Sequence, residues 1–77
     1  MTEQEWREQF AENLRLRMEE FGYSQRDLAD DVGISESAIS RYLAGQQVPK
    51  VTALLNIAYA LDCSLDDLAD FQERVIM

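Results

Sequence analysis

A short segment of the chain, residues 36–44, combines small polar side chains with a single arginine. At about 100° per residue, Ser37, Arg41 and Ala44 share one side of a helix. Short side chains would allow this helix to approach base edges closely, and an arginine can pair with guanine through two hydrogen bonds. An ordinary solvent-exposed helix shows the same polar pattern, so the segment by itself leaves both interpretations open.

The sequence offers little for catalysis. It contains no histidine, a single cysteine and no phosphate-binding glycine loop, so the usual sets of nucleophile, base and metal ligand are missing. Cys63 occupies an apolar position, which favours a small buried hydrophobe over a reactive thiol. We therefore expect no enzymatic activity, no cofactor and no metal site.

Two short predicted helices and a glycine turn position the 36–44 segment. The first helix is predicted over Gln25 to Val32 and the second over Glu36 to Ala44, with Gly33 in the turn between them. This pattern is typical of a helix-turn-helix, here residues 24–45, whose second helix can enter a DNA major groove.

Serines mark the expected helix starts. Ser24 and Ser35 each precede an amphipathic segment, where a hydroxyl can accept a hydrogen bond from a first-turn amide. An apolar pair brackets each serine at the spacing of a hydrophobic staple, which fixes the angle of chain entry. The pairs are Tyr23 with Leu28, Ile34 with Ile39 and, around Ser64, Cys63 with Leu68.

Further helices are predicted on both sides of this motif. Thr2 and Glu5 have capping-box spacing, and apolar residues recur every three or four positions, which predicts a helix from about Glu3 to Phe21. Its stripe consists of Trp6, Phe10, Leu14, Met18 and Phe21. A fourth helix is predicted over about Val51 to Leu61 and a fifth after Ser64. The expected core positions of the fourth helix are Leu54, Leu55, Ala58 and Leu61.

Length and charge set further limits. The 77 residues predict one all-α domain, 1–77, with a small core that dimerisation would help. No membrane span or signal peptide is evident, which favours a cytoplasmic protein. The net charge is −8, whereas DNA-binding domains usually carry a basic face. Between Ser24 and Lys50, however, three basic residues stand against four acidic ones.

The segment GYSQRDLADDVGISESAISRYLAGQQVP resembles the helix-turn-helix region of the phage-repressor-like family, also called the Cro/C1 or XRE family. The matching positions are Gly22, Ser24, Gln25, Leu28, Ala29, Gly33, Ser35, Ile39, Ser40, Tyr42, Gly45 and Pro49. The likeness continues to about Leu68. It implies a five-helix lambda-repressor-like domain and a phage-type or bacterial repressor that binds double-stranded DNA.

The resemblance also implies roles for individual residues. Arg41 matches a base-contacting position and is expected to be the main reader. The secondary base-contacting residues are expected to be Ser37, Glu36 and Ser40. The predicted contacts to the DNA backbone are Gln25, Ser24 and Arg26 at the start of the first motif helix, and Gln46, Gln47 and Lys50 after the second.

The chain departs from the family at two coupled positions. Many relatives place an arginine in the first helix and a glutamate near the end of the recognition helix, and the two pair. Met18 and Leu43 occupy those positions here. Because replacing both charged partners by apolar residues can be neutral, whereas losing one is costly, we expect Met18 and Leu43 to touch.

Assembly is expected to involve the tail, residues 64–77. Leu68, Phe71 and Val75 continue a helical apolar stripe, which could pack on its own subunit or against a second one. Small repressors of this family commonly dimerise through this end, which favours the subunit contact. We predict a homodimer whose recognition helices lie about 34 Å apart on a palindromic operator.

A second function class stays open. The same fold can serve as a protein-interaction module, such as an antitoxin or an acidic DNA-mimicking adaptor. Gln25 and the small outer face favour DNA, and the charge of −8 favours the protein partner.

Overall fold

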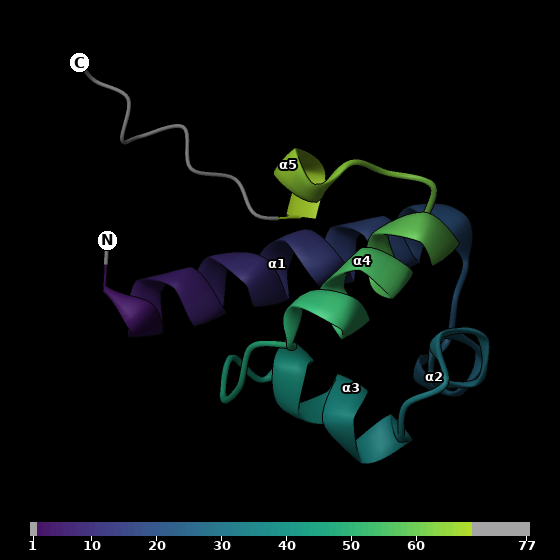
Figure 1. The fold of residues 1–77 in the computed structure, drawn as a ribbon, viewed down its shortest axis with the longest axis horizontal. Helices are drawn as coiled ribbons and strands as arrows, with labels where there is room; N and C mark the ends of the chain where they lie inside the picture. The colour runs from purple at the N-terminus through teal and green to yellow at the C-terminus, as the bar shows by residue number, and fades with distance from the viewer. Residues whose placement is uncertain (1, 69–77) are drawn as a thin grey trace.

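The computed structural model describes residues 2–68, and within them the chain forms five helices and no strand. The helices are α1 (Glu3–Phe21), α2 (Gln25–Val32), α3 (Glu36–Leu43), α4 (Val51–Ala60) and α5 (Leu65–Leu68). Helix α1 contacts α3 and α5, and α4 contacts α2 and α5. Figure 1 shows α2 and α3 together in the lower part of the view, with α5 on the opposite side of α4 from α3. The predicted all-α fold is confirmed.

Local capping sets the bounds of α1. The Thr2 amide donates to Glu5 Oε1 at 2.7 Å, and the Glu5 amide donates to Thr2 Oγ1 at 3.1 Å. At the other end, Gly22 has a φ of 70°, the left-handed conformation that ends a helix without Cβ strain. The prediction of a helix from Glu3 to Phe21 is confirmed.

Three serines begin helices in the same way. The hydroxyls of Ser24, Ser35 and Ser64 accept from the amide three residues ahead at 3.0, 3.1 and 3.2 Å. The apolar residue before each serine packs against the core, and the residue four positions after it is completely buried. The predicted serine caps are therefore confirmed, and both members of each staple pair lie in or against the core. The direct contact within each pair, which would fix how the helix leaves its turn, stays a prediction.

One core holds the helices together. Phe10 lies between two aromatic neighbours: Trp6 stacks on it at a ring separation of 5.5 Å, and Tyr42 meets it edge-on at 6.1 Å. These contacts tie α1 to the inner face of α3. The largest fully buried side chains are Phe10, Leu14, Leu28, Ile39, Ile57, Leu61 and Leu68.

One predicted core position in helix α4 is wrong. Leu55 was expected inside, but 48% of it is exposed, and Ile57 is fully buried instead. Leu54 is partly buried against the core, and Ala58 and Leu61 are buried as predicted. The helix is apolar on almost every side, so periodicity could not select its inner face; contacts with α2 and α5 do so.

The C-terminal end of the predicted α1 stripe also differs from the prediction. Phe21, expected in the core, is 49% exposed, and its ring stacks on Tyr23 at 6.4 Å. Three residues before Phe21, Met18 is buried in the core, and Leu43 of α3 packs against the same core. Their direct contact stays a prediction.

Helix α5 closes the core against α1. The Asn13 amide nitrogen donates to the Leu68 carbonyl at 2.8 Å, and Arg17 pairs with Asp67 at 3.2 Å. The Leu68 side chain has no exposed surface. Leu68 is therefore unavailable for the predicted dimer contact, because its side chain fills the core of its own subunit. Phe71 and Val75 lie outside the described residues.

Candidate nucleic-acid interface

Helix α3 presents one polar face to solvent. Ile39 and Tyr42 are buried, so the opposite side of the helix points outward. All four predicted base-contacting residues are exposed there or at the first turn: Glu36, Ser37, Ser40 and Arg41. The predicted orientation of this helix is confirmed, and their contact with bases stays a prediction.

The loop after α3 folds back on the last turn of the helix. The Gln46 amide donates to the Arg41 carbonyl at 3.0 Å, and Gly45 has a φ of 71°. This reversal brings the Gln47 side chain to Arg41, whose Nε donates to Gln47 Oε1 at 2.9 Å. A residue predicted to contact bases and one predicted to contact the DNA backbone are thus directly joined.

Helix α1 anchors the same loop. Arg7 Nε donates to the Gly45 carbonyl at 3.2 Å, and the Arg7 guanidinium also pairs with Glu3 at 3.2 Å. Sequence reasoning missed this role, because 38 residues separate Arg7 from Gly45. No local pattern distinguishes Arg7 from the other charged residues of α1.

The start of α2 offers groups that suit a phosphate. Gln25 and Arg26 are exposed in the first turn. Ser24 Oγ accepts from the Asp27 amide at 3.0 Å, which leaves the hydroxyl hydrogen available to a phosphate oxygen. The unpaired amides at a helix start also attract anions. Asp27 carries an opposing negative charge in the same turn.

The described cations divide into two groups. On α1, Arg7 pairs with Glu3, Arg15 with Glu12, and Arg17 with both Glu20 and Asp67. In the helix-turn-helix and its following loop, the cations are Arg26, Arg41 and Lys50, and none has a carboxylate partner within residues 2–68. The cations of α1 are therefore paired, whereas those of the helix-turn-helix have no such partner, although four carboxylates lie in the same stretch of chain: Asp27, Asp30, Asp31 and Glu36.

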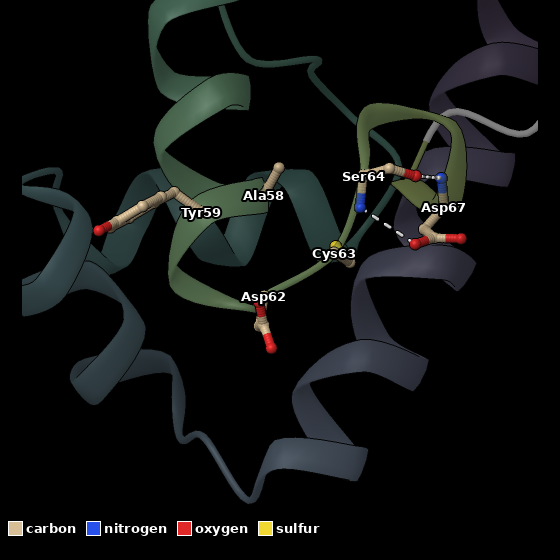
Figure 2. Close-up of a pocket in the computed structure, with 6 residues that line it drawn as sticks. All are labelled: Ala58, Tyr59, Asp62, Cys63, Ser64 and Asp67. Carbon is tan, nitrogen blue, oxygen red and sulfur yellow. Dashed lines mark hydrogen bonds between the residues drawn. The ribbon is translucent and has the colours of Figure 1, made fainter.

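A separate depression lies at the turn between α4 and α5. It has a volume of about 580 Å³, opens widely to solvent and is lined by Ala58, Tyr59, Asp62, Cys63, Ser64 and Asp67 (Figure 2). Cys63, which was predicted to be buried, is only partly buried against the core. Desolvation raises the pKa of its thiol, which disfavours the reactive thiolate. In Figure 2 the Tyr59 ring points away from Cys63 and Ser64.

Comparisons with known proteins agree with this geometry. Residues 14–68 match the family described as Helix-turn-helix. The chain is 37% identical over 59 residues to an uncharacterised HTH-type transcriptional regulator, YqaE of Bacillus subtilis, covering 77% of this chain and 51% of that protein. It is 33% identical over 57 residues to the cryptic phage CTXphi transcriptional repressor RstR of Vibrio cholerae, covering 74% and 51%.

A solved structure supports the same fold. The hypothetical transcription factor NHTF from Neisseria superposes with a TM-score of 0.81 at 28% identity, covering 96% of this chain and 86% of that one. The chain spans about half the length of the curated relatives it matches.

The fold and the α3 face define a helix-turn-helix domain of the lambda-repressor type. The chain belongs to the Cro/C1-type helix-turn-helix family of transcriptional regulators, a family of non-enzymatic proteins.

Proposed function

We propose that this protein binds double-stranded DNA sequence-specifically, with α3 in the major groove, and acts as a repressor of phage or bacterial type. The proposal rests on the cations Arg26, Arg41 and Lys50, which form no ion pair with a carboxylate within residues 2–68. A chain with a net charge of −8 needs a local surface that attracts phosphate. These three cations provide such a surface beside the exposed face of α3.

Each side chain of this surface has a distinct proposed role. Arg41 reads a guanine with its terminal nitrogens, which have no hydrogen-bond partner in the described part of the chain while Gln47 holds Nε. Ser37 and Ser40 allow close approach. Glu36 accepts from a cytosine amino group and, by repelling phosphate, rejects incorrect sites. The backbone contacts come from Ser24, Gln25 and Arg26 at α2 and from Gln46, Gln47 and Lys50 in the loop.

The active form we propose is a homodimer on a palindromic operator in the cytoplasm. Two copies related by a two-fold axis would place two α3 helices in successive major grooves, about 34 Å apart. The relative RstR is a phage transcriptional repressor, which supports the assignment to gene control. Within residues 2–68, no helix is both long enough and apolar enough to cross a membrane.

Fluorescence anisotropy tests the DNA proposal. The full chain is titrated with random-sequence duplexes at low salt, where electrostatic association is strongest, and preferred sites are then selected. We expect measurable binding and a selected palindrome. Because this surface carries three cations, log K should fall with log salt with a slope no steeper than about −2.7 per subunit. The absence of duplex binding at low salt would refute the proposal.

A protein-interaction module is the second candidate function. The acidic excess of the chain favours it, since fifteen acidic residues stand against seven basic ones. A DNA mimic would bind a basic protein surface and would be displaced from it by duplex DNA. The same anisotropy titration separates the candidates, because a mimic binds no duplex at low salt.

A further inference from the structure

Helix α4 carries an apolar stripe that the monomer leaves uncovered. Val51, Leu55 and Tyr59 follow one another at intervals of four residues and therefore share one side of the helix. Their exposed fractions are 72%, 48% and 90%. The core lies on the other side, where Ile57 and Ala58 are buried. We call these three residues the α4 stripe.

The surroundings of the α4 stripe are unusual for this protein. Among the helices described here, α4 is the one without a charged residue. Leu16 of α1 provides the contrast: it is also 48% exposed, but charged residues surround it, with Glu12, Glu19 and Glu20 at neighbouring helical positions. A contiguous apolar patch on a highly charged surface marks an interaction site, whereas a single exposed leucine does not.

We infer that the α4 stripe is the surface through which two copies of this chain pack together. Two chains that each carry a charge of −8 repel one another, so their contact needs an element free of carboxylates. Helix α4 provides that element. The inference names the interface of the homodimer proposed above and rests on that part of the proposed function.

The order of residues in the stripe favours an antiparallel pairing of the two α4 helices. Leu55 is central, so a two-fold axis beside it places Leu55 against its own copy and Val51 against Tyr59 of the partner. An aromatic ring then covers the small valine. Asp62 follows the end of α4, and antiparallel packing keeps the two Asp62 carboxylates at opposite ends of the contact. Parallel packing would bring them together.

Sedimentation velocity of the full chain without DNA tests this interface. The unmutated protein should be a dimer that dissociates on dilution. Leu55→Asp should raise the dimer dissociation constant by about 100-fold or more, because it buries two facing carboxylates. Leu16→Asp is the matched control, since it replaces the same residue type at the same exposure, and it should leave the dissociation constant unchanged. Circular dichroism establishes that both variants fold.

A mixing experiment tests the position of the two-fold axis. Leu55→Lys should also be monomeric, whereas an equimolar mixture of Leu55→Lys and Leu55→Asp should recover a dimer, because the axis places opposite charges together. A folded Leu55→Asp protein that still dimerises would overturn the inference, as would an unmutated protein that stays monomeric at all concentrations. Loss of the dimer in Phe71→Asp but not in Leu55→Asp would assign the contact to the tail instead. Binding of each variant to a duplex that carries a single half-site is measured separately. Because one subunit is enough for this binding, it tests the DNA proposal independently of the dimer interface.

Discussion

The guanidinium of Arg41 is held by the side chain of Gln47, with Arg41 Nε donating to Gln47 Oε1 at 2.9 Å. Arg41 lies in the last turn of α3, and Gln47 lies in the loop that follows. The hydrogen bond restricts the rotamers of a long side chain, so less conformational entropy is lost when Arg41 meets a base. Gln47 keeps its amide hydrogens for a phosphate. Base and backbone recognition are therefore expected to be coupled.

Gln47→Leu tests this coupling. The substitution removes the acceptor for Arg41, and we expect binding to the selected site to weaken by about 0.5–1.5 kcal/mol, with reduced preference at the base pair that Arg41 reads. Gln47→Glu keeps an acceptor but repels phosphate, so it should preserve the preference while lowering affinity for all duplexes. Anisotropy with single-base operator variants measures both quantities. If Gln47→Leu costs the same binding free energy in the unmutated protein as in the Arg41→Ala variant, the two side chains are not coupled.

Arg41→Ala tests the proposed reader itself. We expect a loss on the order of 1–3 kcal/mol on the selected site and a flattened preference at one base pair. Gln25→Ala should weaken binding to all sequences alike, because a phosphate contact carries no base information. Arg15→Ala is the control: it also removes one positive charge, but Arg15 pairs with Glu12 on α1, so its effect should be small. Unchanged affinity and preference in Arg41→Ala would exclude Arg41 as the reader.

Leu43→Glu tests whether Met18 and Leu43 form the apolar contact predicted between α1 and α3. Leu43 packs against the core that contains Met18, so a glutamate there would be partly buried without a partner and should destabilise the fold by about 1–3 kcal/mol. Adding Met18→Arg should recover part of the loss by supplying the partner. Urea denaturation of the two single variants and the double variant measures the coupling free energy. A double variant no more stable than Leu43→Glu would argue against contact between positions 18 and 43.

Asp67→Asn tests the closure of α5 on α1. The hydrogen bond from the Ser64 amide, helped by the Ser64 hydroxyl and Arg17, holds the pKa of Asp67 below its usual value. A depressed folded-state pKa gives stability that is present above the unfolded-state pKa and disappears as pH falls through the folded-state pKa. Asp67→Asn should therefore destabilise the protein at pH 7 and weaken the fall in stability in acid.

Asp66→Asn provides the control for this experiment. Asp66 is exposed in the same helix, and its side chain makes no hydrogen bond or ion pair with any residue in the range 2–68. Urea denaturation at neutral and acidic pH compares the two variants. Equal pH dependence of Asp67→Asn and the unmutated protein would show that the Asp67 contacts add nothing to stability.

Sequence alone determined where the helices of the motif begin and, to within one residue, where they end: α3 was predicted to reach Ala44 and ends at Leu43. The signals are local: Ser24 and Ser35 bond amides three residues away, and Gly33 adopts the left-handed conformation that its neighbours avoid. Such interactions involve only residues a few positions apart, so the sequence of the motif contains all the residues that form them. The outward direction of Arg41 followed from the same patterns, because the apolar residues of α3 occupy one side.

Tertiary structure decided the features that depend on distant contacts. Helix α4 is apolar on most sides, so only packing against α2 and α5 could show that Ile57 enters the core and Leu55 stays outside. Likewise, only the folded chain brings Arg7 to the Gly45 carbonyl and Gln47 to Arg41. Helical periodicity reports on a single helix, whereas these contacts arise where separate elements meet, and their relative positions are set by the whole core.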